Sequence, residues 1–587
     1  MSWRHIRRIR SRLAKEQGTI YKDWGGRLRV ALAFPNTYYV GMSSLALHVV
    51  YRAFNALPHV VCERTFWEKP EAEAGLPLLT YESQRPVQDV DIFAFTVSFE
   101  MDYLNILDLL RQADIPLRSQ ERLETTRPDG RPWPLVIAGG PAVSMNPEPL
   151  APFIDAFVIG EGEDVIPVMA DIVHTHGADR HAALTELANV PGIYVPLHHP
   201  ADPRDPAFRP IERLWARNEL RIPPTTLIHT PDTEFANMHL IEIARGCGRA
   251  CRFCLAGYIY RPPREQPLEA ILAWAQEGLQ HTDRIGLVSA AVSDYSRIDE
   301  LAVRLREMGA RISVSSMRTD PISVPLVKAL AESGTRTLTI APEAGSQRLR
   351  DVISKTQTVD DLMAAVDLAE SLRFPQLKLY FMIGHPTETE EDIDELIAFV
   401  QEVRRRFRRH LIINATPFVP KPHTPFQWVA MAPTEVLKAR QKRITRALAP
   451  HRVTVRADNP DWAAVQAVLS RGDRHVGEVL ARLDRLSPRA FFRTMEALGL
   501  DPQAYLGSWD PAQPTPWDIV GSGLRVKYFL REWRLAQKAQ TGKECPPQAK
   551  GCLSCGVCDP AWAFRDASQP PHAVPSPAPI PLVETLP

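Results

Sequence analysis

The chain has 587 residues, a length that suggests several domains, and its contents of 45% hydrophobic and 24% charged residues are ordinary for a globular protein. Its 69 lysine and arginine residues equal its 69 aspartate and glutamate residues, so no global charge attracts nucleic acid or a membrane. No apolar run reaches about 18 residues, and none follows the basic N-terminus. These patterns exclude a transmembrane helix and a secretory signal, and we expect a cytoplasmic protein without membrane partners.

The first segment of the chain, residues 1–27, is basic, and its apolar residues recur at helical spacing. The apolar positions are Trp3, Ile6, Ile9 and Leu13, and arginines stand at positions 4, 7, 8, 10 and 12. The pattern predicts an amphipathic helix. We favour a helix that docks its apolar face on the protein body, and the alternative is a contact with RNA phosphates.

Residues 28–200 alternate strand-like and helix-like segments, which is typical of a doubly wound, Rossmann-type α/β domain. Strands are predicted at 28–34, 60–66, 91–98, 134–138 and 155–159, and helices at 43–54 and 102–114. Ligands of such sheets bind beyond the carboxyl ends of the strands. No Gly-x-Gly-x-x-Gly follows the first strand and no phosphate-binding loop is present, so a nucleotide signature is lacking.

The strand ends of this domain resemble those of the cobalamin-binding domain, which has Asp-x-His-x-x-Gly after the first strand, Ser after the third and Gly-Gly after the fourth. Here Asn36-Thr-Tyr38-Tyr-Val-Gly41 follows the first strand. The resemblance implies that cobalamin contacts Tyr38, Gly41, Ser98, Gly139, Gly140, Gly160 and Gly162. Because Tyr38 replaces the histidine, the resemblance also implies cobalamin without a histidine ligand on cobalt. The alternative is a domain that binds nothing, or only a partner.

Seven of the eight cysteines fall into two groups, a spacing that favours metal ligands over disulfides in a chain without a secretion signal. Cys62 stands alone and is expected to be a buried core thiol. After a linker at 201–235, a buried strand at 239–245 leads to Gly246 and to Cys247, Cys251 and Cys254. Four thiolates complete an iron–sulfur cluster, so three leave one iron open.

The segment Cys247-Gly-Arg-Ala-Cys251-Arg-Phe253-Cys254 resembles the signature loop of radical S-adenosylmethionine (SAM) enzymes. The resemblance implies that Cys247, Cys251 and Cys254 hold a 4Fe–4S cluster whose open iron binds the amino and carboxylate groups of SAM. It implies reductive cleavage of SAM to a 5′-deoxyadenosyl radical, an external electron donor such as flavodoxin or ferredoxin, and Phe253 packed near the cofactor. The alternatives are a zinc knuckle or three unlinked thiols.

Residues 236–430 alternate strands and helices, which predicts a partial (β/α)6 barrel with its active site at the carboxyl ends of the strands. After the cysteine-bearing strand, strands are predicted at 284–289, 311–315, 336–340, 376–383 and 410–415. Glu343 and Arg348 follow the fourth strand in a segment that resembles the SAM-contacting segment of the family. Gly384 opens Gly-His-Pro-Thr-Glu-Thr, which resembles the turn on the adenine side.

The second strand of the barrel departs from the family pattern. Many members have Gly-Gly-Glu there, and this chain has Ser289-Ala-Ala-Val-Ser-Asp294. Ser289 or Asp294 is the candidate for the same contact with the SAM amino group. Taken singly, each of these strand-end segments is also typical of a helix cap or a tight turn.

The C-terminal part is predicted to be mainly helical over 431–540, with a cysteine segment at 541–562 and a disordered, proline-rich tail at 563–587. The cysteine segment contains Cys545, Cys552, Cys555 and Cys558. Four cysteines can hold an auxiliary 4Fe–4S cluster or a structural zinc ion. The spacing does not decide between them.

The two resemblances together indicate a cobalamin-binding radical SAM enzyme that transfers a methyl group to an unactivated carbon of an unknown substrate. One alternative is a radical reaction without methyl transfer, such as a rearrangement, a cyclisation or a modification of RNA or protein. Methylthio transfer is less favoured, because methylthiotransferases carry three cluster cysteines in the leading domain and this chain has only Cys62 there. The non-enzymatic alternative is an iron–sulfur redox sensor or RNA-binding adaptor. No catalytic residue beyond the cofactor sites can be named.

Overall fold

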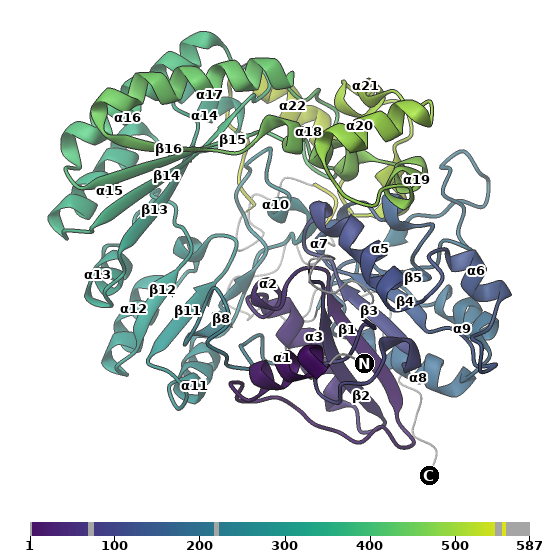
Figure 1. The fold of residues 1–587 in the computed structure, drawn as a ribbon. Coiled ribbons are helices and arrows are strands. Elements are labelled where there is room, and N and C mark those ends of the chain that lie inside the picture. The colour runs from purple at the N-terminus through teal and green to yellow at the C-terminus, as the bar shows by residue number, and fades with distance from the viewer. Residues whose placement is uncertain (1–2, 69–75, 217–221, 546–554, 559–587) are drawn as a thin grey trace.

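The computed structural model describes residues 3–68, 76–216, 222–545 and 555–558 (Figure 1). Cys552 and the predicted proline-rich tail therefore lie outside the described residues. The described chain forms one α/β sheet domain, a second, barrel-like set of parallel strands, and a C-terminal group of helices that contacts both.

The first sheet has six strands in the order β2-β1-β3-β4-β5-β6. The strands are β1 (Leu28–Phe34), β2 (Val60–Phe66), β3 (Ile92–Thr96), β4 (Leu135–Gly139), β5 (Ala156–Val158) and β6 (Ile193–Tyr194). The first five run parallel, and β6 is antiparallel to β5. This order reverses direction between β1 and β3, and ligands of doubly wound sheets bind at that switch point. The predicted fold class is confirmed for this domain.

Helices cover both faces of the first sheet, which explains why its strands are buried along almost their whole length. One face is covered by α1 (Trp3–Leu13), α3 (Leu45–Ala56), α8 (Ile166–His176) and α9 (Arg180–Leu187). The other is covered by α5 (Tyr103–Gln112) and by the C-terminal helices α18 (Pro460–Arg471), α19 (Arg474–Ala481) and α20 (Pro488–Ala497). Helix α1 buries Ile9 and partly buries Ile6 and Leu13 against this domain, but Trp3 of the same predicted face is 73% exposed.

The barrel has seven parallel strands in two sheets, β12-β11-β8 and β13-β14-β15-β16. The strands are β8 (His239–Glu242), β11 (Arg284–Val288), β12 (Arg311–Val314), β13 (Thr337–Glu343), β14 (Gln376–Ile383), β15 (His410–Pro417) and β16 (Val453–Ala457). A parallel bridge between Met317 and Ile340 joins the two sheets. Strand β16 adds a seventh strand to the predicted six. The sequence did not reveal β16, because it is an edge strand in which only Val453 is buried.

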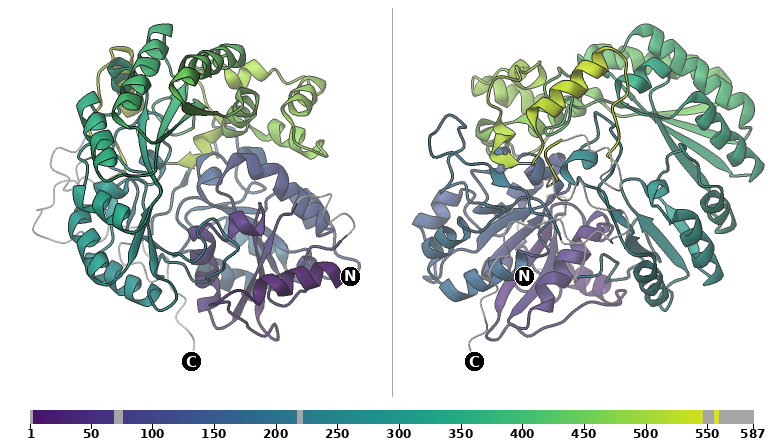
Figure 2. Two further views of the ribbon diagram at one scale, coloured as in Figure 1. Left: turned by 60° about the vertical axis from the view of Figure 1, so that its left-hand side comes forward. Right: turned by 180° about the vertical axis from the view of Figure 1, so that it is seen from behind.

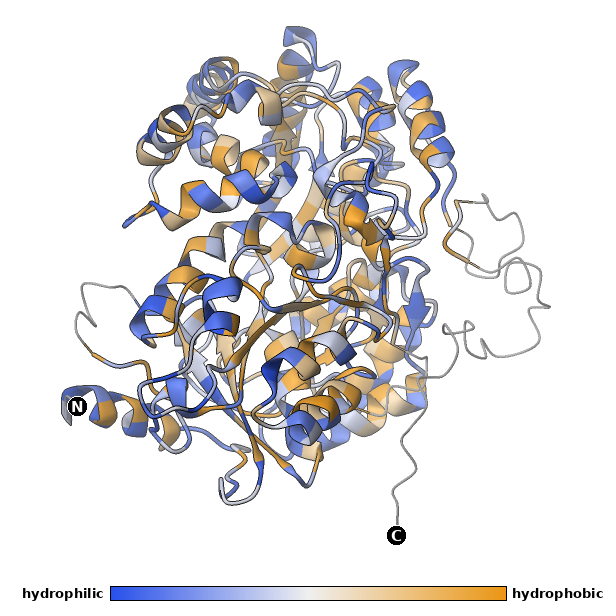
Figure 3. Cartoon of the chain, turned by 90° about the vertical axis from the view of Figure 1, so that its right-hand side faces the viewer, coloured by the Kyte–Doolittle hydropathy of each residue, from blue (hydrophilic) through white to orange (hydrophobic). Residues whose placement is uncertain are grey.

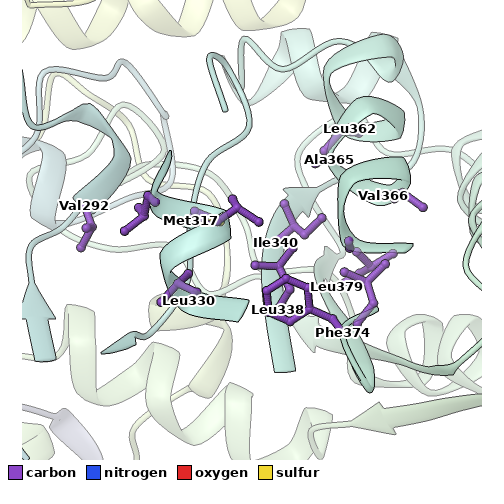
Figure 4. Packing of buried hydrophobic residues seen from close by; sticks show 14 of the residues in the cluster. Val292, Met317, Leu330, Leu338, Ile340, Leu362, Ala365, Val366, Phe374 and Leu379 are labelled. Carbon is purple, nitrogen blue, oxygen red and sulfur yellow. The ribbon is translucent and has the colours of Figure 1, made fainter. Parts of the chain in front are cut away.

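Helices pack on the outside of these strands, and Figure 4 shows their apolar side chains meeting those of the sheet. They are α11 (Leu268–Gly278), α12 (Ile298–Glu307), α13 (Val324–Glu332), α15 (Val359–Ser371), α16 (Glu390–Arg406) and α17 (Thr434–Leu448). Helix α16 shows why the sequence specifies them. It has a capping box between Thr389 and Asp392, acidic residues in its first turn and three arginines in its last, which match the helix dipole.

Short elements connect these layers. The helices are α2 (Tyr38–Gly41), α6 (Ser119–Glu124), α7 (Pro141–Met145), α10 (Ala256–Ile259), α14 (Gln347–Val352), α21 (Pro502–Leu506) and α22 (Val526–Gln537). The short strands are β7 (Ile211–Glu212), β9 (Ala244–Arg245), β10 (Arg264–Glu265) and β17 (Val520–Gly521). Single 3-10 turns lie at Val87–Asp89, Glu100–Asp102, Glu148–Leu150, Val292–Asp294, Ala449–His451 and Pro516–Ile519.

The carboxyl edge of the first sheet is turned toward the cysteine loop of the barrel. In Figure 1, α2 and α7 of the first domain lie on the side of α10, the helix that follows the cysteines, and α7 contacts α10. Figure 2 shows the C-terminal helices lying across both parts. Figure 3 shows hydrophobic residues concentrated along the strands and the inner faces of the helices. No helix among the described residues is both long and apolar enough to cross a bilayer.

Candidate functional site

The three predicted cluster cysteines lie in the loop that leaves β9. Gly246 turns the chain with φ of +80°, and a Cβ there would lie 2.1 Å from the carbonyl oxygen of Tyr260. Cys251 is buried, and burial together with the neighbouring Cys251 and Cys254 thiols raises the pKa of Cys247 to about 12. The three thiols are therefore electrostatic neighbours that cannot all ionise without a bound cation.

Among the described residues, no three His, Cys, Asp or Glu side chains converge on one metal ion. Thiolates on a single ion at about 2.3 Å stand at most about 4.6 Å apart. A 4Fe–4S cluster binds each cysteine through a separate iron, so it does not require three thiols on one ion.

Two arginines that the sequence analysis did not name hold this loop. Arg318 Nη1 lies 3.6 Å from the Cys251 Sγ atom, and its Nη2 donates to Asp320 at 2.7 Å. Arg249, inside the loop, donates to both carboxylate oxygens of Asp294 at 2.7 and 2.8 Å. Arg318 could have been found as a charged residue just beyond the third barrel strand. Asp294, a candidate for the SAM amino group, is committed to Arg249.

A ring cluster lies beside the last cysteine. Phe253 and His385 have ring centroids 6.1 Å apart, and His385 lies 5.4 Å from Phe418. Burial lowers the pKa of His385 to about 4, so the ring is neutral at pH 7 and offers one donor and one acceptor. Neither ring nitrogen makes a hydrogen bond of standard geometry in the described part of the chain, although the Glu343 backbone is close enough to raise the pKa of the ring. These orphaned polar atoms beside Phe253 fit a ligand that carries polar atoms of its own.

Glu343 also reaches the cysteine loop. It ends β13 with φ of +66°, where the pairing with β14 shifts register. Its carboxylate lies 3.5 Å from the ammonium of buried Lys355, and both charges act on the Cys254 thiol. Lys355 was not foreseen, because it follows α14 rather than a strand. The two residues offer a charged pair within reach of a ligand at the cluster.

Three other candidate residues at the strand ends make contacts away from the cysteine loop. Arg348 is paired with Asp392 at the start of α16 and has a side chain that is 41% exposed. Gly384 packs against α17, where a Cβ would lie 2.6 Å from Leu437. Ser289 accepts a hydrogen bond from the Ala291 backbone at 3.3 Å. The structure therefore brings Phe253 and Glu343 to the cysteines, while Arg348 is held at the N-terminus of a helix.

The predicted cobalamin residues divide between the core and the edge of the first sheet. Tyr38 is buried, its hydroxyl donates to Glu16 at 2.6 Å, and its ring stacks on Tyr81 with centroids 5.5 Å apart. Gly41 is also buried, and a Cβ there would lie 2.5 Å from the Phe66 ring. The remaining members, Ser98, Gly139, Gly140, Gly160 and Gly162, are exposed or half-buried at strand ends.

Large apolar side chains are exposed at the switch point of the first sheet. Tyr39 and Val40, after β1, are 46% and 42% exposed, and Phe99, after β3, is 44% exposed. The Tyr39 hydroxyl donates to Glu234 at 2.9 Å. In the same two loops, Asn36 donates to Asp102 at 2.8 Å, and burial raises the pKa of Asp102 to about 7. Large apolar side chains exposed at a switch point are candidates for contact with a ligand.

An ion network fixes this edge to the cysteine loop. Glu161, after β5, accepts from Arg264 and, at 3.0 Å, from Arg245, the residue that precedes the loop. Arg245 also pairs with Glu163 at 2.8 Å and Glu242 at 2.7 Å. Burial alone would raise the pKa of Glu161, but the two arginines hold it at about 2. Predicted Gly160 and Gly162 flank this contact between the two sheets.

The second cysteine group is described in part. Cys545 is half-buried beside the first loop, Cys555 is buried, and Cys558 is half-buried. Cys62, by contrast, is 1% exposed in the core of the first domain, as expected. The first domain therefore offers no clustered cysteines among its described residues.

Comparison with known proteins agrees with this architecture. The family model "Radical SAM proteins, N-terminal" matches residues 46–196, and that of the radical SAM superfamily matches residues 241–400. An uncharacterized protein of Methanocaldococcus jannaschii is 32% identical over 458 residues, which are 77% of this chain and 90% of that protein. The ribosomal protein uS12 methylthiotransferase RimO of Chlorobium phaeobacteroides is 27% identical over 35% of this chain and 49% of its own.

Among solved structures, the radical SAM methyltransferase TsrM of Kitasatospora setae, with cobalamin and a [4Fe-4S] cluster bound, has a TM-score of 0.50. The two chains are 14% identical, and the match covers 80% of this chain and all of that one. At this identity the likeness concerns the fold. It extends over both the first sheet and the barrel.

Proposed function

This chain belongs to the radical SAM superfamily, and from that premise we propose that it is a cobalamin-dependent enzyme that methylates an unactivated carbon. The observation that carries the proposal is the position of the exposed switch-point residues Tyr39, Val40 and Phe99. They lie at the sheet edge that Glu161 ties to the cysteine loop. A cofactor on that edge would therefore stand next to one held by the cysteines.

The cluster and SAM would be held by residues on the barrel. Cys247, Cys251 and Cys254 are the ligands that we assign to a 4Fe–4S cluster, and Phe253, His385 and Glu343 are those that we assign to SAM. When bound, the cluster supplies the electron that cleaves SAM, and cobalamin supplies the transferable methyl group. Arg318 offers a positive charge 3.6 Å from the Cys251 sulfur, which stabilises a thiolate there. Phe253 and Phe418 keep water from the neutral His385 ring.

Cobalamin would rest on the apolar residues of the switch point. Tyr39, Val40 and Phe99 offer exposed apolar surface that a large ring would bury, and the half-buried Gly139 and Gly162 carry no side chain that would hold the ring away from the backbone. The burial of Tyr38 and its hydrogen bond to Glu16 argue against a tyrosine ligand to cobalt. The electrons would come from an external donor such as flavodoxin or ferredoxin.

Methylthio transfer is supported by relatives such as RimO but disfavoured by the first domain. The match spans about half of that relative's length and lies within a third of this chain. A second cluster in the first domain would need cysteines there, and the one cysteine among its described residues is Cys62, which is buried in the core. A radical reaction without methyl transfer remains the second candidate, because family membership alone supports it.

The test is cofactor analysis of the full chain, purified anaerobically from cells supplied with cobalamin. We expect about one cobalt per chain, and a Phe99→Asp variant that loses cobalt but keeps its iron, because the charge would lie under an apolar ring. Phe492→Asp on α20, a half-buried phenylalanine away from the switch point, is the matched control and should keep both metals. Cys251→Ala should abolish the release of 5′-deoxyadenosine from SAM.

Two results would contradict the proposal. If the wild-type chain contained iron but no cobalt after this preparation, the cobalamin assignment would fail. If cobalt were present and 5′-deoxyadenosine formed without S-adenosylhomocysteine in assays with candidate substrates, the second candidate, radical chemistry without methyl transfer, would replace it.

A further inference from the structure

The C-terminal cysteine segment lies directly on the outer side of the first cysteine loop. The backbone N–H of Cys545 donates to the carbonyl of Gly248 at 2.6 Å. A Cβ on Gly248 would lie 2.9 Å from the carbonyl oxygen of Cys545. Glu544 pairs with Arg249 at 2.6 Å, so two successive C-terminal residues bind two successive loop residues. The contact between the C-terminal segment and the loop therefore consists of specific interactions, a hydrogen bond and an ion pair.

The other two described cysteines of this segment approach the same loop from its far end. Cys555 packs in an apolar cluster with Tyr258 and Tyr528, and Tyr258 is four residues beyond Cys254. The carbonyl of Cys555 accepts a hydrogen bond from the Arg525 backbone at 2.8 Å, just before α22. Cys558 is close enough to act on the charge of Arg213. Residue 545 therefore lies against the start of the Cys247 loop, and residues 555–558 lie near its end.

Two guanidinium groups are buried in that region without a carboxylate. Arg261 donates to the carbonyl of Gly257 and the hydroxyl of Tyr528, both at 3.1 Å, and to the Arg249 carbonyl at 3.3 Å. Arg213 donates to the carbonyls of Ile259 and Arg261, and its Nε atom has no partner in the described part of the chain. Both side chains are at most 5% exposed. Among the described residues, neither has a carboxylate within ion-pair distance.

Buried positive charge is costly unless an anion compensates it. Glu161 acts on the charge of Arg213, but its carboxylate already pairs with Arg245 and Arg264. Burial raises the pKa of Tyr258 and Tyr528, so these neighbours of Arg261 stay protonated.

The remaining groups that can become anionic are the cysteines, which do so readily when a metal binds them. Three thiolates on a divalent ion, or four on an iron–sulfur cluster, leave the centre with a net negative charge. Arg213 and Arg261 would balance that charge. We propose that Cys545, Cys555 and Cys558 are ligands of a second, thiolate-bound metal centre on the outer side of the Cys247 loop.

The centre would be zinc or an iron–sulfur cluster, and both share the thiolate chemistry. Among the described residues no three His, Cys, Asp or Glu side chains are placed to hold one metal ion, and Cys552 of this segment lies outside those residues. The proposal depends on residues other than those that carry the cobalamin assignment. It therefore stands or fails separately from the proposed function.

The experiment measures iron, acid-labile sulfide and zinc per chain on the anaerobically purified full-length protein. The wild type should contain about eight irons, or about four irons and one zinc, given four irons per 4Fe–4S cluster. Cys555→Ala should lose either about four irons or the zinc and keep about four irons. Cys62→Ala, a substitution of a buried cysteine in the first domain, is the matched control and should change neither metal.

A second variant distinguishes loss of a metal ligand from misfolding of the C-terminal segment. The triple variant with alanine at Cys247, Cys251 and Cys254 should retain the metal of the second centre, about four irons or one zinc per chain. The proposal is overturned if that variant holds no metal, or if Cys555→Ala keeps the full wild-type content. In the triple variant, zinc without iron would identify a zinc site. Iron together with acid-labile sulfide would identify an iron–sulfur cluster.

Discussion

Glu161 gives the most direct test of how the two sheets are held together. Its side chain is 2% exposed and receives Arg245 at 3.0 Å as well as Arg264. The pKa of Glu161 is held at about 2, against an ordinary value of 4.5. At about 1.4 kcal/mol per pH unit, that difference corresponds to about 3 kcal/mol of stabilisation. Glu161→Gln should remove most of it, because Arg264 would lose the one carboxylate with which it forms an ion pair in the described residues.

The control is Glu163→Gln. Glu163 contacts the same Arg245 at 2.8 Å, but Arg245 keeps Glu161 and Glu242 in that variant. We expect Glu163→Gln to cost less than about 1 kcal/mol. The assay is anaerobic urea unfolding at pH 7. Because a chain of this size does not unfold in one step, the free energy of the first unfolding transition is compared between the variants.

The pH dependence has a definite sign. Because the pKa of Glu161 is lower in the folded chain, its contribution is complete above about pH 4.5 and is lost as the pH falls toward 2. The difference between wild type and Glu161→Gln should therefore be constant between pH 7 and pH 5 and shrink below that. Equal costs for the two variants, or a difference that grows in acid, would refute the assigned role of Glu161.

Three further substitutions test the site. Arg318→Met should lower the reduction potential of the cluster, since it removes the positive charge 3.6 Å from the Cys251 sulfur; an unchanged potential in a redox titration followed by electron paramagnetic resonance would show that the arginine does not act on the cluster. His385→Phe should raise the KM for SAM by about tenfold, which corresponds to about one lost hydrogen bond, and steady-state release of 5′-deoxyadenosine measures it; an unchanged KM would remove His385 from the SAM site. Tyr38→Phe should keep its full cobalt content and lose about 1 kcal/mol in urea unfolding through its hydrogen bond to Glu16, whereas loss of cobalt would restore the tyrosine as a ligand.

The fold was predictable because its signals are local. The parallel strands of the first sheet are short apolar runs between turn residues, and helices such as α16 have complete capping signals. The cysteine loop was recognisable for the same reason, since its three cysteines lie within eight residues. Strand β16 escaped prediction because it pairs along one edge only and buries a single residue, so that tertiary pairing rather than pattern creates it.

The charged residues of the site were harder to predict, because their partners are distant in sequence. Arg348 stands in a segment that resembles the SAM-contacting one, yet Asp392, 44 residues later, holds its guanidinium at the start of α16. Arg318 reaches the Cys251 sulfur across 67 residues. Its position just beyond a barrel strand makes it a candidate, but no local pattern identifies Cys251 as its partner. An ion pair of this kind depends on which strand ends become neighbours in space. A single sequence does not contain that information.

The loop after β1 shows how a shift of one residue changes a functional assignment. Residues 38–41 form one turn of helix, α2, and in a helix the positions i and i+3 share a face. Positions 38 and 41 therefore share the buried face of this turn, and Tyr39 and Val40 lie on its exposed face. A motif comparison aligns Tyr38 with a cobalt-ligating histidine, but the helical geometry exposes its two neighbours instead. The chain would then contact a large apolar cofactor through Tyr39 and Val40, which supports a cobalt atom without a side-chain ligand from this loop.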